Sequence, residues 1–269
     1  MKNENVLIIG SGISGLGAVK LANHYKYNIR VTSRDLIDLI DKKYLISLGI
    51  DFEEGTNSIF NLDWATIIVK SPGVPPNIDL LQKARDMGVP IISEIEFAYR
   101  HTDSIIIGVT GTNGKTTTSQ LLYQILKNQG LNVSLAGNIG VSFSESIINN
   151  PSDYYVLEIS SFQLEDIVDF KPNVAILLNT SQDHLDRYND NFNHYVKTKM
   201  KIQMNQDSMD SFIYFQNDLN ITPYLEAIKA QKYSFTTSHT CSNGFGAFIK
   251  DEEIIINTIQ NNFTMTIHN

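Results

Sequence analysis

The first 95 residues alternate short apolar runs with segments in which apolar residues recur every three or four positions. The apolar runs have the length and the β-branched residues of buried strands, and they lie at 6–9, 29–32, 66–70 and 90–93. Residues 14–25 and 36–48 have helical spacing. Strands that alternate with helices predict a parallel, doubly wound α/β sheet.

A second series of the same kind begins at residue 105. We predict its strands at 105–109, 133–136, 154–159, 174–178 and 212–215, and its helices at 115–128 and 192–204. Further short strands are expected at 246–250 and 253–256, with a strand-like stretch at 264–269. Because the chain stops there without a closing helix, we expect a fragment. With a junction between residues 93 and 103, we predict two domains, 1–95 and 96–269, the second incomplete at its C-terminal end.

Composition narrows the class of protein. Of 269 residues, 42% are hydrophobic and 19% charged, as in globular proteins, and no apolar run approaches the length of about 20 residues that spans a bilayer. The single cysteine, Cys241, excludes an internal disulfide framework. The net charge of −8 argues against nonspecific binding of nucleic acid. We expect a cytoplasmic monomer with no nucleic-acid or membrane partner, in which any phosphate is held by local geometry.

A glycine turn follows the first predicted strand. Residues 10–15 read G-S-G-I-S-G and open a helix, whose N-terminal N–H groups can bind a pyrophosphate. The alternative is a plain turn without a ligand. NAD or FAD requires an acidic residue about 20 positions further on, where the chain has Ser33, with Asp35 two residues later. This weakens the dinucleotide hypothesis and leaves room for a UDP-type ligand.

A second glycine-rich loop carries a stronger signal for phosphate binding than the first. Residues 108–117 read G-V-T-G-T-N-G-K-T-T, between a predicted strand and a predicted helix. Val109 replaces the first glycine of the strict P-loop pattern, but the remaining glycines still let N–H groups face phosphate oxygens. Lys115 can then reach the β- and γ-phosphates, and the Thr116 hydroxyl can bind Mg²⁺. The alternative is a glycine-rich loop with a solvated lysine.

Four segments carry a resemblance to a known family. T-G-T-N-G-K-T-T at 110–117 is the phosphate loop of Mur ligases and folylpolyglutamate synthases. The segments S-P-G-V-P at 71–75, E-I-S-S-F-Q-L at 158–164 and N-T-S-Q-D-H-L-D-R-Y at 179–188 resemble further Mur ligase motifs. The chain is therefore identified as similar to the Mur ligase family, and most like its D-glutamate-adding members.

The resemblance implies a Rossmann-like domain that binds a UDP substrate, followed by a truncated P-loop-type ATP-binding domain. It implies a ligase of peptidoglycan precursor synthesis that adds D-glutamate to UDP-N-acetylmuramoyl-L-alanine through an acyl phosphate, with ATP and two Mg²⁺ sites. Because the family has a further C-terminal domain, we expect this chain to be inactive alone.

The resemblance also implies roles for individual residues. The ATP-binding residues are Gly111, Thr112, Asn113, Gly114, Lys115, Thr116 and Thr117. Thr116 and Glu158 hold the ATP-linked metal, while His184, oriented by Asp183, and a carbamylated Lys199 hold the second. The catalytic residues are Lys115, His184 and Lys199, and the substrate residues are Ser14, Gly15, Ser33, Arg34, Gly73, Asn138 and Ser160.

Without the resemblance, Lys199, like Lys197 and Lys201, is typical of a solvated basic helix face. Glu158, at the end of an apolar strand beside the phosphate loop, favours a Mg²⁺ ligand, with a structural carboxylate as the alternative. Three other functions remain open: another Mur-type or folylpolyglutamate ligase, a Rossmann oxidoreductase fused to an NTPase-like domain, and a noncatalytic nucleotide-binding module.

Overall fold

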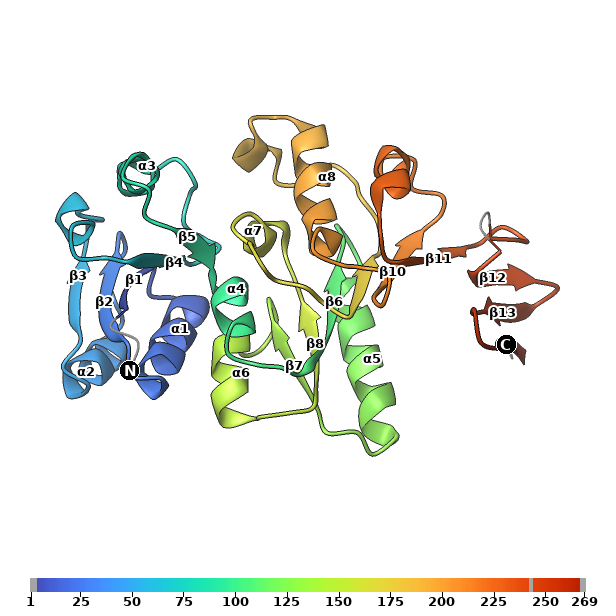
Figure 1. Cartoon of the computed structure of the whole chain (residues 1–269), viewed down its shortest axis with the longest axis horizontal. Coiled ribbons are helices and arrows are strands. Elements are labelled where there is room, and N and C mark those ends of the chain that lie inside the picture. Colours follow the sequence, from blue (N-terminus) through green and yellow to red (C-terminus); the bar gives the residue numbers. More distant parts are fainter. Residues whose placement is uncertain (1–3, 242–243, 267–269) are drawn as a thin grey trace. The chain divides into compact units, whose positions relative to one another are not determined.

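The computed structural model describes residues 4–241 and 244–266, and Figure 1 labels its helices and strands where there is room. They form two compact units. The first comprises the chain up to Ser104, Ser134–Asp153 and Phe162–Phe170. The second comprises Ile105–Val133, Tyr154–Ser161 and the chain from Lys171 onward. The domain division at residue 95 stays a prediction.

The first unit contains a five-stranded parallel sheet in the order β3-β2-β1-β4-β5. Its strands are β1 (Asn5–Ile9), β2 (Asn28–Ser33), β3 (Asp51–Glu54), β4 (Ile67–Lys70) and β5 (Ile91–Ser93). The predicted parallel α/β fold is confirmed. The pattern did not predict β3, because its sequence, Asp-Phe-Glu-Glu, contains one apolar residue.

The helices of the first unit come from two parts of the chain. They are α1 (Ile13–His24), α2 (Leu39–Ser47), α3 (Asp79–Asp86), α4 (Glu94–Tyr99), α6 (Phe143–Asn149) and a 3₁₀ turn at Ile59–Asn61. Helix α6 packs against α1, where a Cβ on Gly17 would lie 1.9 Å from Ser142 Oγ. Gly17 therefore lets the two helices approach closely.

A buried apolar cluster holds β1 and β4 against the segment around α3. Its members are Leu7, Ile9, Leu62, Ala65, Ile68, Leu80, Leu81 and Ala84. The other apolar residues of β1, Val6 and Ile8, are also fully buried. Burial on both faces explains why this strand is a continuous apolar run and not an alternating one.

The second sheet has nine strands in the order β14-β13-β12-β11-β10-β9-β6-β8-β7. These strands are β6 (Ile105–Thr110), β7 (Val133–Gly137), β8 (Tyr154–Glu158), β9 (Val174–Leu177), β10 (Ser211–Phe215), β11 (Gln231–Thr236), β12 (Gly246–Lys250), β13 (Glu253–Asn257) and β14 (Asn262–Thr266). Pairing is parallel from β8 to β12 and antiparallel from β12 to β14. Residues 267–269 of the predicted last stretch lie outside the described residues.

Helix α5 (Lys115–Asn128) has the predicted bounds. A short α7 (Ser161–Leu164) follows β8, and 3₁₀ turns occur at Leu185–Tyr188 and Thr222–Ala227. The helix predicted to end at residue 204 was too long, since α8 (Phe192–Met200) passes into a 3₁₀ turn at Lys201–Gln203. Among the described residues, no helix is long and apolar enough to cross a membrane.

The segment predicted as the junction, 93–103, contains helix α4, which the apolar pattern did not predict. Two of its six residues, Glu94 and Glu96, are buried acids. Glu94 Oε1 accepts the Ser144 N–H at 2.6 Å, and Oε2 has no hydrogen-bond partner among the described residues. Burial raises the pKa of Glu94 to about 7, although the Ser144 hydrogen bond opposes that shift. The ionised form of Glu94 therefore destabilises the fold.

We predict that Glu94→Gln flattens part of the pH dependence of stability. The folded-state pKa lies above the unfolded value, so the native chain loses stability as pH rises from about 4.5 to about 7. The loss approaches about 3 kcal/mol, and glutamine does not ionise. Denaturant unfolding between pH 4.5 and 8.5 should show the slope in the unmodified chain and a smaller one in the variant.

Glu54→Gln provides the control of opposite sign, because the Lys42 hydrogen bond lowers the pKa of Glu54. The stability that Glu54 contributes is lost only as pH falls below about 4.5, so Glu54→Gln should keep the slope between pH 4.5 and 8.5. Parallel stability curves for Glu94→Gln and the unmodified chain would contradict the prediction.

Candidate functional site

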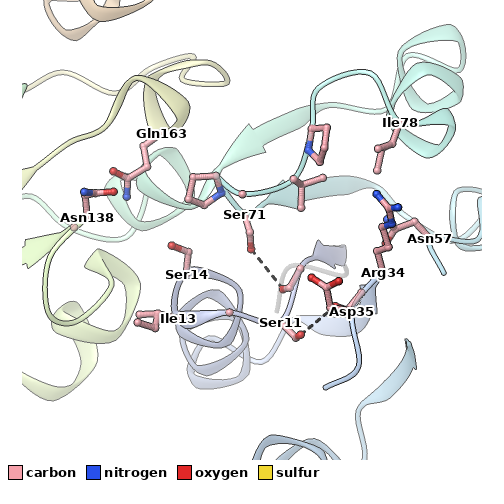
Figure 2. A pocket seen from close by; sticks show the side chains of 18 of the residues that line it. Ser11, Ile13, Ser14, Arg34, Asp35, Asn57, Ser71, Ile78, Asn138 and Gln163 are labelled. Carbon is pink, nitrogen blue, oxygen red and sulfur yellow. Dashed lines mark hydrogen bonds between the residues drawn. The ribbon is translucent and has the colours of Figure 1, made fainter. Parts of the chain in front are cut away.

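A cavity of about 680 Å³ lies within the first unit, at the carboxyl ends of β1, β2 and β4 (Figure 2). Open parallel sheets bind ligands at this edge, where the strand order reverses. In the order β3-β2-β1-β4-β5, the reversal falls between β1 and β4. The lining residues are Gly10, Ser11, Gly12, Ile13, Ser14, Ser33, Arg34, Asp35, Asn57, Ser71, Pro72, Gly73, Val74, Pro75, Ile78, Gly137, Asn138, Gly140 and Gln163.

Five of the predicted substrate residues line this cavity: Ser14, Ser33, Arg34, Gly73 and Asn138. Gly15 and Ser160 are not among the lining residues. Figure 2 shows Arg34, Asp35 and Asn57 toward one end of the cavity and Asn138 and Gln163 toward the other. One end of the cavity therefore carries the charged side chains of Arg34 and Asp35. The other end, which we call the amide-bearing end, carries the amides of Asn138 and Gln163.

The glycine turn shapes the floor of the cavity. Gly10 has φ +96°, a conformation that favours glycine, and its N–H donates to the Thr32 carbonyl at 2.8 Å. Ser11 Oγ donates to Ser33 Oγ at 3.1 Å, which ties the turn to the end of β2 (Figure 2). Helix α1 begins at Ile13 without a side-chain cap. Its first N–H groups, at the positive end of the helix dipole, suit an anion.

Gly15 contributes through packing. A Cβ on this residue would lie 1.9 Å from the Gly10 carbonyl oxygen and 3.0 Å from Ser71 Oγ. The first of these atoms belongs to the backbone and cannot move without distorting the turn. Gly15 thus lets α1 start directly against the turn after β1.

The phosphate loop joins β6 to α5 in the second unit. Gly111 and Gly114 have φ +155° and +83°, so the chain curls between them. Val109, at the place of the missing first glycine, is a buried residue of β6. An extended strand residue needs no glycine, which explains the departure from the strict pattern. Lys115 Nζ donates to the carbonyls of Gly111 at 3.0 Å and Thr112 at 2.8 Å.

Asn179, just after β9, braces this loop. Its Oδ1 accepts the Asn113 N–H at 2.9 Å, its Nδ2 donates to the Asn113 carbonyl at 3.0 Å, and its carbonyl accepts the Thr112 N–H at 3.0 Å. Thr112 Oγ1 also accepts the Ser181 N–H and lies 3.0 Å from the Tyr195 hydroxyl. These contacts hold the loop in one conformation.

Thr116 and Glu158 meet beside the phosphate loop. Thr116 Oγ1 donates to Glu158 Oε2 at 2.7 Å, and Glu158 ends β8, which pairs with β6. A hydroxyl and a carboxylate are hard oxygen donors of the kind that Mg²⁺ prefers. The donor chemistry of this pair therefore fits the predicted ATP-linked metal.

Lys199 is the buried lysine of α8, whereas Lys197 is exposed and Lys201 half-buried. Its Nζ donates to the Gly111 carbonyl at 2.8 Å and lies 4.7 Å from the centre of the Tyr195 ring. Burial, and to a smaller extent the nearby charge of Lys115, lower the pKa of Lys199 to about 7, against the opposing charge of Asp183. A large fraction of this side chain is a neutral amine near pH 7, as carbamylation requires.

His184 lies after β9 with φ +50° and is half exposed. Its Nε2 is 3.5 Å from Asp183 Oδ2, the neighbour predicted to orient it. The structure thus brings Thr116 and Glu158 into direct contact. The described contacts of the other two predicted ligands differ, because His184 lies beside Asp183 and Lys199 donates to the Gly111 carbonyl. Within residues 4–241 and 244–266, no group of three or more His, Cys, Asp or Glu is arranged as a metal site.

Asp35, Asn57, Ser71, Gln163 and Asn179 were not predicted as site residues. Ser71 and Gln163 stand inside the S-P-G-V-P and S-S-F-Q segments, so the motifs contained a signal for them. Asp35 follows Arg34 directly and could also have been included. Asn179 is the first residue of the N-T-S-Q-D-H-L-D-R-Y segment, so that motif also contained a signal for it. Asn57 follows the end of β3, and a single asparagine there carries no distinctive pattern.

Gly15→Ala should destabilise the first unit. The added methyl overlaps the Gly10 carbonyl, and overpacking of this kind costs about 1–3 kcal/mol. Gly12→Ala is the matched control within the same motif, since a Cβ there meets nothing within 4 Å. Denaturant unfolding should therefore separate the two variants. Equal losses of stability would contradict the packing role of Gly15.

Glu158→Gln should weaken the binding of Mg-ATP by roughly tenfold or more, because glutamine keeps an acceptor for Thr116 but loses the charge that favours a cation. Affinity for ATP in the presence of a chelator should change little. Titration calorimetry with and without Mg²⁺ measures both, and Glu226→Gln, an exposed site in the same unit, serves as control. A variant that keeps the full magnesium dependence would exclude Glu158 as a ligand.

Comparisons with known proteins agree on one family. Residues 109–267 match the family described as the Mur ligase middle domain. The chain is 41% identical over 255 residues to a UDP-N-acetylmuramoylalanine–D-glutamate ligase of Bacteroides fragilis, covering 94% of this chain and 57% of that protein. A protein of the same name from Christiangramia forsetii is 37% identical over 264 residues, with 97% and 59% covered. The chain thus spans less than two thirds of the length of these relatives.

The fold also matches a solved structure, the UDP-N-acetylmuramate:L-alanyl-gamma-D-glutamyl-meso-diaminopimelate ligase of Neisseria meningitides. The TM-score is 0.59 at 18% sequence identity, over 97% of this chain and 86% of that chain. At this identity the likeness concerns the fold alone.

Proposed function

The chain belongs to the Mur ligase family, and on this premise we propose that it forms the substrate- and ATP-binding part of a ligase that adds D-glutamate to UDP-N-acetylmuramoyl-L-alanine. The observation that carries the proposal is the Thr116–Glu158 pair beside a braced phosphate loop. The names of relatives 41% and 37% identical support the choice of D-glutamate. The reaction belongs to peptidoglycan precursor synthesis, in the cytoplasm, and we propose a monomer.

The proposed chemistry joins two anions. The carboxylate of the UDP substrate attacks the γ-phosphorus of ATP, the bond to the β-phosphate oxygen breaks, and an acyl phosphate and ADP form. The amine of D-glutamate then attacks the acyl carbon, loses a proton, and expels phosphate as the amide forms. Repulsion between the carboxylate and the triphosphate is the main obstacle, so the site must supply positive charge.

The phosphate loop supplies that charge locally. The N–H groups of Thr112 and Asn113 donate to Asn179, so in this proposal the N–H groups of Gly114 to Thr117 bind the phosphates. Lys115 then turns from its carbonyl partners toward the β- and γ-phosphate oxygens. Thr116 and Glu158 would hold one Mg²⁺, which neutralises phosphate charge when bound.

The proposed second metal site contains His184 and Lys199. Lys199 Nζ, as a neutral amine, attacks CO₂ and loses a proton, which converts a cation into an anionic carbamate. A buried anion next to Lys115 has favourable electrostatics, whereas two neighbouring lysines repel each other. Asp183 Oδ2 lies 3.5 Å from His184 Nε2, and in this proposal the carboxylate helps to orient the ring.

The cavity of the first unit takes the UDP substrate in this proposal. N–H groups of Ser14 and Gly15 bind the diphosphate at the start of α1. Ser33, Arg34 and Gly73, which line the cavity, contact the uridine diphosphate, and Asn138 contacts the muramoyl end. Arg34 and Asn138 lie toward opposite ends of the cavity (Figure 2). Ser160 is kept as a further proposed contact near the muramoyl end.

Calorimetry on this chain tests the proposal. We expect UDP-N-acetylmuramoyl-L-alanine to bind more tightly than UDP, since the amide-bearing end of the cavity then gains contacts, and we expect Mg-ATP to bind independently. UDP-N-acetylmuramoyl-dipeptides and dihydropteroate are the comparison ligands. Tighter binding of either would favour a different ligase of the family, and the absence of any UDP-sugar binding would refute the proposed substrate.

A further inference from the structure

Lys70 is a buried lysine that joins two distant segments of the first unit. It is the last residue of β4, and its side chain is 1% exposed. Its Nζ donates to Glu165 Oε2 at 2.9 Å and lies 2.8 Å from Asp166 Oδ2. We call these three residues the Lys70 cluster. Its members come from segments that are 95 residues apart in sequence.

Burial of such a cluster contributes little to net stability. Removing a lysine and two carboxylates from water costs free energy, and their mutual attraction only offsets that cost. A well-packed apolar group would stabilise the end of β4 at least as well. What the charges add is a directional tie, because the ammonium fixes where both carboxylates lie.

Both sides of the tie carry cavity residues. Ser71 directly follows Lys70, and Ser71 and Gly73 line the cavity. The Ser71 N–H also donates to the Ile9 carbonyl at 2.9 Å, which fixes this wall to β1. On the other side, Gln163 lines the cavity and is buried, two residues before Glu165. We call the lining segment with Ser71 and Gly73 the Ser71 wall, and the lining segment with Gln163 the Gln163 wall. The Lys70 cluster links these two walls.

The segment 162–170 has two further anchors. The Ser93 N–H donates to the Asp166 carbonyl at 2.9 Å. Glu96 Oε2 accepts the N–H groups of Val168, Asp169 and Phe170 at 2.9, 3.0 and 2.8 Å. These bonds fix the segment from Asp166 onward, and the Lys70 cluster ties Glu165 and Asp166, two and three residues after Gln163, to the end of β4.

We propose that Lys70 is a positioning residue that sets the separation between the Gln163 and Ser71 walls and thereby the grip of the cavity on a nucleoside-diphosphate sugar. The inference rests on the proposed function, in which this cavity binds the UDP substrate. Lys70 itself does not line the cavity, so it acts through the two segments it joins. The sugar-bearing portion of the ligand is the part that senses the change, because Gln163 lies at the end away from Arg34 (Figure 2).

The test is Lys70→Met in the full chain, with calorimetry for UDP-N-acetylmuramoyl-L-alanine, UDP and Mg-ATP. Methionine keeps a long apolar side chain and removes the ammonium. We expect affinity for the UDP-sugar to fall by roughly tenfold or more, as small displacements of binding groups do. Affinity for UDP should fall less, and affinity for Mg-ATP should stay unchanged. A purely structural role for Lys70 would not produce this ordering.

Two further variants keep the test decisive. Lys171→Met is the matched control, because Lys171 also lies between two carboxylates, Asp207 at 3.0 Å and Asp210 at 3.2 Å, and lines no part of the cavity. It should leave UDP-sugar affinity unchanged. The triple variant Lys70→Met, Glu165→Gln, Asp166→Asn removes the repulsion between unpaired carboxylates, so it should fold even where the single variant does not, and its UDP-sugar affinity should stay low.

Wild-type affinity in Lys70→Met, or full recovery in the triple variant, would overturn the positioning role. A uniform loss for all three ligands would also overturn it, since that marks general unfolding. If the unmodified chain binds Mg-ATP but no UDP-sugar, the proposed function of the cavity fails first, and the inference fails with it.

Discussion

Parallel strand pairing is the constraint on which the phosphate site depends. Strand β6 lies between β8 and β9, with Val109 opposite Glu158 and Thr110 opposite Leu177. Since all three strands run the same way, the phosphate loop, Glu158 and the loop after β9 leave the sheet at one edge. A slip of one residue would turn Glu158 to the other face of the sheet and away from Thr116. The position of the site therefore depends first on the register of these strands, and only then on the side chains they carry.

Charge is handled locally in both units. The chain carries a net charge of −8, so its overall field repels anions. The first unit offers the start of α1, and the second offers the glycine-rich loop with Lys115. Lys199 donates to the same carbonyl as Lys115, and the proximity of the two ammonium groups helps to keep Lys199 partly neutral. The proximity of Lys115 disfavours an ammonium group at Lys199 and so favours a neutral, nucleophilic amine there.

The sequence predicted the elements whose signals are local. Apolar strands such as β1 and β6 and the helix after the phosphate loop, α5, follow from composition and glycine placement within about ten residues. Helix α4 was missed because Glu94 and Glu96 count as solvent-exposed in any pattern. Their partners, the N–H groups of Ser144 and of residues 168–170, lie 50 to 74 positions away.

The same reason limits what the sequence could predict about the sites. The motifs predicted the lining residues Ser14, Ser33 and Gly73, because glycine turns and strand ends are visible in one stretch of chain. Asn57 is brought to the cavity by the folding of the chain after β3 and belongs to no motif. Asn179 belongs to a motif, but its bonds to the phosphate loop are visible only in the folded chain. A short polar residue after a strand has many ordinary uses, and only the folded chain distinguishes them.

The first unit is assembled from separate stretches of chain, which has a consequence for how such a protein can be divided. A gene segment ending at Ser104 would encode the five-stranded sheet without α6, whose Ser142 occupies the space that Gly17 leaves open. It would also lack the peptide N–H groups that surround the Glu96 carboxylate. Because each unit consists of several separate stretches of the chain, recombination at a single crossover cannot exchange one unit and leave the other intact.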